Sequence, residues 1–138
     1  MNKTYVLDAN AVISFIQGEP GAHRVEQLIG AAATQQVRLL MSVMNWGEVF
    51  YYAWQRHGEE RARETMAKLS RLQFDLIAID LPQALKAAEI RAAHNVPYVD
   101  SVAAALAEIR QATLVTADRD FEKLGRRIPI LWIAHRVK

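Results

Sequence analysis

Several features that often hold a protein together or carry it across a membrane are missing from this sequence. None of its 138 residues is cysteine, which excludes disulfide bonds and thiolate zinc sites and leads us to expect a reducing, intracellular compartment. No apolar run approaches the roughly 18 residues of a membrane-spanning helix, and the N-terminus enters a strand pattern without the apolar stretch of a signal peptide. We therefore expect a cytoplasmic protein.

A strong net charge is also lacking, because 17 basic residues stand against 15 acidic ones and leave +2. This balance conceals a partition: if four acids are committed to one cluster, 11 acids remain against 17 basic residues in the rest of the chain. Twelve of the basic residues are arginine, whose side chain pairs with phosphates through two hydrogen bonds and stacks on bases. This partition favours a polyanion that approaches the acidic cluster.

What the sequence has is the composition of a globular domain, with 51% apolar and 23% charged residues, and we expect a single domain over residues 1–138. Apolar runs suited to buried strands alternate with stretches of helical periodicity. Because parallel strands need helical crossovers, this order predicts an α/β fold with a mainly parallel sheet of about five strands between helical layers. The expected strands are 4–7, 37–41, 74–79, 113–116 and 130–133, and the expected helices include 11–16, 25–32, 43–57, 59–72, 81–94 and 99–109.

For two of the expected helices the sequence also predicts which residues cap the helix or form its apolar or aromatic faces. In 81–94, Asp80 and Gln83 predict an N-cap with a capping box, and the apolar face is expected to consist of Leu81, Leu85, Ala88 and Ala92. In 43–57, Trp46, Phe50 and Trp54 share one side while Tyr51 and Tyr52 point elsewhere. This spread of aromatic side chains predicts an interface, either with a second copy in a homodimer or with a protein partner.

Four acids from distant segments are expected to converge at one edge of the sheet. Asp8 and Asp118 follow strands, whereas Glu48 and Asp100 lie near the starts of helices that begin at the same edge, where α/β sheets bind ligands. Each acid also has an ordinary structural interpretation. Asp8 could cap the next helix, Asp100 could interact with a helix dipole, Glu48 could be solvated and Asp118 could form a turn.

Carboxylates on rigid element ends are the oxygen ligands that hard divalent cations such as Mg²⁺ or Mn²⁺ require. Histidine and cysteine are absent from these four positions, which argues against zinc.

With these residues in view, the sequence resembles PIN-domain ribonucleases, and in particular the VapC-type toxins of type II toxin-antitoxin systems. The resemblance runs nearly end to end and rests on the order and spacing of four segments, residues 5–10, 42–49, 98–104 and 114–121. It implies a PIN-like α/β/α sandwich.

The resemblance also implies an activity and a site. It implies an Mg²⁺- or Mn²⁺-dependent endoribonuclease that hydrolyses RNA phosphodiester bonds without a side-chain nucleophile and is held by a VapB-like antitoxin. The implied catalytic and metal-binding residues are Asp8, Glu48, Asp100 and Asp118, with Thr116, Asp120 and Asn10 as supporting groups. Asn10 departs from the pattern, because a small hydroxyl residue is common there.

Two other kinds of function are open to a chain of this pattern, a phosphatase or receiver-like metal-binding domain and a non-catalytic binding module. A phosphatase of the haloacid-dehalogenase type would have a second Asp where this chain has Asn10, and a receiver domain would have paired acids after the first strand and a Lys on a later loop. A non-catalytic RNA- or protein-binding module on the same scaffold would tolerate the loss of an acid, yet all four are present.

Overall fold

The computed structural model describes residues 3–135, and its centre is a parallel sheet of five strands. The strands are β1 (Lys3–Leu7), β2 (Val37–Ser42), β3 (Phe74–Ile77), β4 (Thr113–Thr116) and β5 (Ile130–Trp132). They pair in the order β3-β2-β1-β4-β5, and every pair is parallel. The predicted α/β fold is therefore confirmed, and β1 and β4, which precede Asp8 and Asp118, are neighbours.

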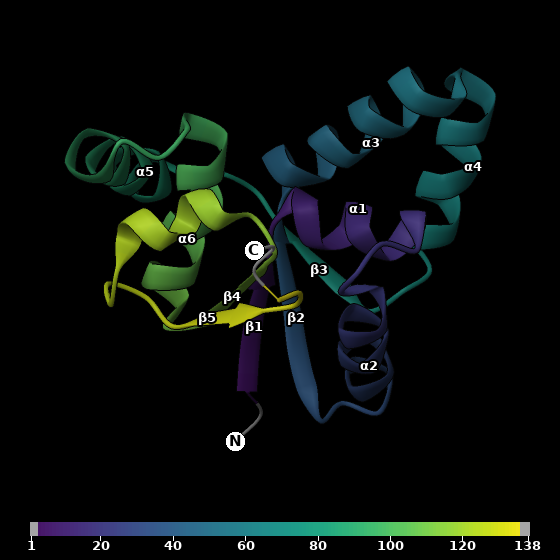
Figure 1. Ribbon diagram of the computed structural model, residues 1–138, viewed down its shortest axis with the longest axis horizontal. Helices are drawn as coiled ribbons and strands as arrows, with labels where there is room; N and C mark the ends of the chain where they lie inside the picture. The colour runs from purple at the N-terminus through teal and green to yellow at the C-terminus, as the bar shows by residue number, and fades with distance from the viewer. Residues whose placement is uncertain (1–2, 136–138) are drawn as a thin grey trace.

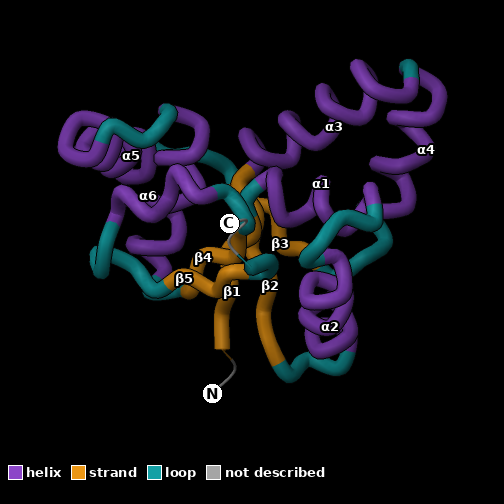
Figure 2. The backbone as a smooth tube through the Cα atoms, in the orientation of Figure 1, coloured by secondary structure: helices purple, strands orange, loops and turns teal. Residues whose placement is uncertain are grey.

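Helices cover both faces of this sheet (Figures 1 and 2). On one face lie α5 (Leu81–His94), α6 (Tyr98–Arg110) and the 3₁₀-helix η1 (Arg119–Leu124). The other face carries α1 (Ala9–Gln17), α2 (Ala22–Ala33), α3 (Val43–His57) and α4 (Glu59–Leu69). In the described part of the chain, no helix combines the length and the apolar character that a membrane crossing requires.

Two hydrophobic cores result, because alternate strand residues point to opposite faces of the sheet. Val6, Leu40 and Leu114 pack toward α5 and α6, whereas Leu7, Leu39 and Val115 pack toward α1 and α2. The first core is lined by small residues of α6 that are fully buried, which brings this helix close to the sheet. These residues are Ala103, Ala104, Ala105 and Ala107.

Most predicted boundaries agree with the structure to within three residues, and the largest differences from the predicted ends are at the ends of α4 and β3. Helix α4 ends at Leu69 rather than at residue 72, because Ser70 caps it and its hydroxyl donates to the Ala67 carbonyl at 2.7 Å. Strand β3 ends at Ile77, because its last partner, Ser42, turns into the N-cap of α3. The turn expected after Asp118 is the start of η1.

The predicted apolar face of α5 is wrong. The helix packs on α6 through Ala87 and Ile90, so Leu81 and Leu85 remain 70% and 63% exposed. Asp80 caps the helix as predicted, since its Oδ1 accepts from the backbone N–H of Gln83 at 3.0 Å. The capping box is not reciprocated, because the Gln83 side chain donates instead to the Ala78 carbonyl at 2.9 Å.

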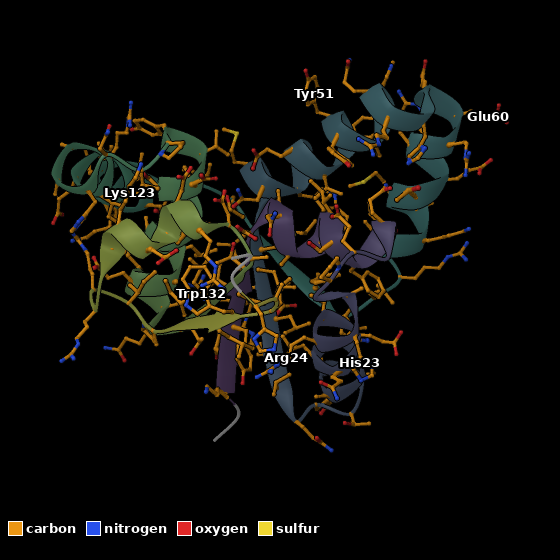
Figure 3. All side chains as sticks on the ribbon, viewed as in Figure 1. His23, Arg24, Tyr51, Glu60, Lys123 and Trp132 are labelled. Carbon is orange, nitrogen blue, oxygen red and sulfur yellow. The ribbon has the colours of Figure 1, made fainter. Side chains whose placement is uncertain are left out.

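Helices α3 and α4 form a hairpin that extends from the body of the fold (Figure 1). Phe50 and Trp54 meet edge to face with ring centroids 5.5 Å apart, and the Arg63 guanidinium of α4 lies over both rings. Tyr51 is 67% exposed and points away from the hairpin (Figure 3), whereas Trp46 packs on Phe74. Part of the aromatic surface of α3 is therefore exposed.

Candidate metal centre

The four predicted acids come from elements that end or begin at one edge of the sheet. Asp8 follows β1 directly, and Asp118 lies two residues beyond β4, the parallel neighbour of β1. Asp100 is in the first turn of α6, and Glu48 is in the second turn of α3.

Asp8 is the most buried of these acids, with only 2% of its surface exposed. Its Oδ1 accepts from the backbone N–H of Ala11 at 2.8 Å, which makes it the N-cap of α1. Its Oδ2 accepts from the Thr116 hydroxyl at 2.7 Å. The capping interpretation is therefore correct for one oxygen, while the other oxygen connects Asp8 to the end of β4.

Thr116 orders two of the acids through one hydroxyl group. This group donates to Asp8 and accepts from the backbone N–H of Asp118 at 2.9 Å. Asp118 in turn caps η1, because its Oδ1 accepts from the backbone N–H of Asp120 at 3.0 Å. A continuous set of hydrogen bonds thus fixes the positions of three acids relative to the sheet.

Asp100, Asp118 and Asp120 form the tightest group. Each offers one carboxylate oxygen, and the three oxygens lie within 4.8 Å of one another, which is close enough to hold a single cation. Asp120 was expected only as a supporting residue, and η1 brings its carboxylate into this group. Asp8 and Glu48 lie outside the group, although the charges of both interact with Asp100.

The carboxylates of this edge are not neutralised by cations. Within residues 3–135 none of the four predicted ligands forms an ion pair, and the one basic contact of the group is Lys123 Nζ, 3.9 Å from Asp120 Oδ1. Burial raises the pKa of Asp8 to about 7, helped by the charges of Asp100 and Asp118. The pKa of Asp100 also rises to about 7, first because the group is buried and then because Asp118, Glu48 and Asp120 repel its charge.

Glu48 is positioned by an asparagine that the sequence did not single out. The Asn45 amide donates from Nδ2 to Glu48 Oε1 at 2.9 Å and to the Val99 carbonyl at 3.5 Å. Burial raises the pKa of Glu48, and this hydrogen bond opposes the rise. Asn45 is fully buried, and its Oδ1 has no partner among the described residues. The available signal was its position three residues before Glu48, which places both on one helical face.

Asn10 supports the site from the backbone side. Its Oδ1 accepts from the Ala117 N–H at 2.9 Å, so it ties the first turn of α1 to the segment between β4 and Asp118. This contact uses the amide oxygen to position the chain.

The arrangement fits a hard divalent cation. All candidate donors are carboxylate oxygens on fixed element ends, and three of them are close enough to share an ion. Within residues 3–135 their only ion pair is the long contact of 3.9 Å between Asp120 and Lys123. Zinc favours histidine and cysteine ligands, and neither residue is among these donors in the described part of the site. An acidic Asp cluster suited to a divalent metal is therefore present at the sheet edge.

Known proteins share this fold. The PIN-domain family model matches residues 5–127. No curated protein sequence matches the chain, so the other likenesses come from solved structures.

Those structures include VapBC toxin-antitoxin proteins. DNA-bound VapBC from Salmonella typhimurium is 22% identical with a TM-score of 0.73, covering 97% of this chain and 100% of that one. VapBC-1 from Haemophilus influenzae is 20% identical with a TM-score of 0.72, covering 94% and 98%. VapC20 from Mycobacterium tuberculosis, a toxin that cleaves the sarcin-ricin loop, is 15% identical with a TM-score of 0.69, covering 88% and 95%. At these identities the likeness shows the fold alone.

Proposed function

The chain belongs to the PIN-domain family, and from that membership we propose that it is a metal-dependent endoribonuclease and the toxin of a toxin-antitoxin pair. Its substrate is RNA, and its reaction is the hydrolysis of a phosphodiester bond.

The observation that carries this proposal is the acidic group at the sheet edge, in which Asp100 and Asp118 form no ion pair with the described residues and Asp120 forms only a long one. The three carboxylates of Asp100, Asp118 and Asp120 lie within 4.8 Å, and the buried Asp8 interacts with two of them. Burying the carboxylates of Asp8 and Asp100 without basic partners costs free energy in the metal-free protein. A bound cation would recover that cost, which is why the arrangement supports a metal site rather than a structural one.

We assign separate roles to the acids. Asp100, Asp118 and Asp120 would hold Mg²⁺ or Mn²⁺, and the charge of Asp8 acts on Asp100 and Asp118. A bound divalent ion would supply a lowered water pKa and stabilisation of the charge that develops on the phosphate. Glu48 lies outside the tight group and has a raised pKa, so it is the residue suited to accept a proton from the attacking water. Asn45 positions its carboxylate through the 2.9 Å hydrogen bond.

Two observations support RNA as the substrate. The basic residues that remain outside the acidic site outnumber the remaining acids, which favours binding of a polyanion. In addition, the similar fold of Mycobacterium tuberculosis VapC20 belongs to a toxin that cleaves the sarcin-ricin loop.

We further propose that a VapB-like antitoxin and a second copy of the chain are its protein partners in the cytoplasm. Several proteins of similar fold were solved as toxin-antitoxin complexes, two of them bound to DNA. The exposed aromatic side chains of α3, such as Tyr51 and Trp54, supply the kind of anchors that interfaces use.

The test is cleavage of total RNA by the purified protein in Mg²⁺ and in EDTA, followed by mapping of the new 5′ ends. We expect defined cleavage sites in Mg²⁺, and no cleavage in EDTA or for Asp118→Asn. Glu60→Gln is the matched control, because Glu60 is an exposed acid at the far turn of the α3–α4 hairpin (Figure 3). Cleavage by Asp118→Asn at the rate of Glu60→Gln would contradict the assignment.

A further inference from the structure

Trp132 lies beside the acidic group without belonging to it. It pairs with Thr116 in the parallel register of β4 and β5, and the next residue, Ile133, donates its N–H to the Thr116 carbonyl at 3.1 Å. Adjacent strands are about 4.8 Å apart, and Thr116 is the residue whose hydroxyl binds both Asp8 and Asp118. The indole ring is therefore one strand away from the centre of the site, and it is only partly buried.

Arg119 stacks on this ring. Its guanidinium carbon is 4.2 Å from the centroid of Trp132, and its Nη2 donates to the Ala134 carbonyl at 3.0 Å. Although Asp118 and Asp120 flank it in the sequence, Arg119 forms no ion pair with any residue in the range 3–135. These two contacts hold the guanidinium in a fixed plane, and its remaining N–H groups are open to another acceptor.

A second arginine reaches the same place from α2. Gly21, which precedes this helix, adopts φ +104°, and a Cβ there would come within 2.9 Å of the Ile133 side chain and carbonyl oxygen. This close approach brings the first turn of α2 against the segment after β5. Arg24, an exposed residue of that turn without an ion pair to the described chain, lies on the side of α2 that faces the strands (Figure 3).

Together these residues surround a hollow of about 170 Å³ that is lined by Arg24, Arg119, Trp132, Ile133, Ala134 and His135. It combines unpaired cations with an aromatic ring and contains no acidic side chain. Single-stranded RNA is bound by this combination, because arginine pairs with phosphate while a base stacks on an aromatic ring or on a guanidinium plane.

We propose that this hollow is an RNA subsite for the nucleotide next to the scissile phosphate. The base stacks on the Trp132–Arg119 pair, and the adjoining phosphate is bound by Arg24 and the free N–H groups of Arg119. The inference rests on the proposed ribonuclease function and adds which surface receives the flanking nucleotide. It also explains how a polyanion approaches an acidic site, because the arginines offset the repulsion along one side of it.

The direct test is binding of a short single-stranded RNA in EDTA, where metal-dependent cleavage does not interfere, for four variants. Arg24→Ala and Arg119→Ala should each weaken binding about fivefold or more and lower the slope of log Kd against log salt by about 0.7, the value for one lost phosphate contact with a single strand. Trp132→Leu should weaken binding about tenfold, whereas Trp132→Phe, which keeps a ring, should recover most of that loss.

Arg110→Ala is the matched control, because Arg110 is an exposed arginine in the last turn of α6, at the opposite end of this helix from Asp100. It removes the same charge, and we expect close to wild-type affinity. If Arg24→Ala and Arg110→Ala weaken binding equally, or if neither does, the subsite is overturned. Arg24 makes no hydrogen bond in the described structure that folding would need, so this comparison holds even if Trp132→Leu does not fold.

A cleavage assay in Mg²⁺ separates this inference from the proposed function. If the hollow binds substrate, the Arg24→Ala substitution raises KM by a larger factor than it lowers kcat. The Trp132→Leu substitution then shifts the distribution of cleavage sites. If the wild type cleaves RNA while both variants keep its KM and cleavage sites, the subsite is wrong and the nuclease assignment stands. If the wild type cleaves nothing, the proposed function fails, and the binding comparison in EDTA still decides whether the hollow takes RNA.

Discussion

Helix α6 carries two acids in opposite surroundings. Asp100 in its first turn has no basic partner in the described chain, and its pKa rises to about 7 because it is buried among other acids. Glu108, near the other end, contacts Arg127 Nε at 2.7 Å and Lys86 Nζ at 3.3 Å, and the hydrogen bond from Arg127 holds its pKa below the ordinary value.

The comparison shows that the partners of an acid, and not its place on the helix, decide its role. The helix dipole alone would stabilise a negative charge at Asp100 and destabilise one at Glu108, yet the pKa shifts run in the opposite directions. Glu89 of α5 joins the second group, since Arg127 Nη2 contacts its Oε1 at 2.8 Å. The ion-pair group joins α5, α6 and the segment after η1, whereas the acidic group at the sheet edge has the composition and spacing that suit a divalent cation.

The largest expected effect is on the rate of RNA cleavage, which should depend on the acidic group at the sheet edge and not on the ion-pair group. Asp100→Asn should reduce RNA cleavage in Mg²⁺ by about a hundredfold or more, because a metal ligand contributes several kcal/mol to the stabilisation of the transition state. Glu108→Gln on the same helix should leave the cleavage rate near that of the wild type. Initial rates on one defined RNA measure both, and equal losses in the two variants would remove the distinction between the groups.

Thr116 tests whether the acidic group depends on hydrogen bonds as well as on charge, because it binds Asp8 and Asp118 through an uncharged hydroxyl group. Thr116→Val removes the hydroxyl that binds Asp8 and the N–H of Asp118, and we expect a 10- to 100-fold loss of activity or metal affinity. Thr116→Ser keeps the hydroxyl and should retain most of the activity. The same rate assay, with a Mg²⁺ titration, tests this pair, and an active Thr116→Val would show that these hydrogen bonds are dispensable.

Stability should change in opposite directions when each group is neutralised. In EDTA, Asp8→Asn should raise the free energy of unfolding by about 1 kcal/mol or more, because a buried charge is removed while the amide can still cap α1. Glu108→Gln should lower it by about 1–2 kcal/mol, since it breaks charged hydrogen bonds that are partly exposed to solvent. Urea unfolding at pH 7 measures both signs, and a less stable Asp8→Asn would mean that its hydrogen bonds outweigh the cost of its charge.

The pH dependence of stability follows from the same shifts. Asp8 and Asp100 have pKa values of about 7 in the folded protein against an ordinary 3.8, so the folded state binds protons more tightly than the unfolded chain. The metal-free protein should therefore lose stability as the pH rises from about 4 to about 7. Glu89 and Glu108 have lowered pKa values, so their contribution is present above the ordinary pKa of Glu and is lost as the pH falls below it. Unfolding in EDTA between pH 3 and pH 8 should show a maximum on the acid side of neutrality, which Asp8→Asn should flatten.

Much of the fold was predictable because the pattern of apolar residues states it directly. The buried strands follow from periodicity, the cap at Asp80 from its residue type at a helix start, and the convergence of Asp8 with the end of β4 from the common edge of parallel strands. The exposed face of α5 was not predictable in this way, since Leu81 and Leu85 fit an apolar stripe as well as Ala87 and Ile90 do. Only the packing of this helix on α6 decides between them.

The composition of the acidic group was harder to predict than its location. Asp120 joins it because residues after Asp118 form a 3₁₀-helix, and a turn of another type would have pointed this carboxylate elsewhere. Asn45 and Trp132 act through contacts with Glu48 and Arg119, and a single sequence does not reveal such contacts between side chains. The raised pKa values of Asp8 and Asp100 depend on burial first and on repulsion among the acids second, and burial is set by the packing of the whole fold.

The most direct test of the central claim, that the acids at the sheet edge hold a divalent metal ion while the paired acids hold helices together, is calorimetric titration with Mn²⁺. The wild type and Glu108→Gln should bind Mn²⁺ with equal affinity, and at a hundredfold excess over Kd the ion should add about 2.7 kcal/mol to the free energy of unfolding of each. Asp100→Asn should bind at least tenfold more weakly. Equal Mn²⁺ affinity in the wild type and Asp100→Asn, or loss of binding in Glu108→Gln, would contradict the account.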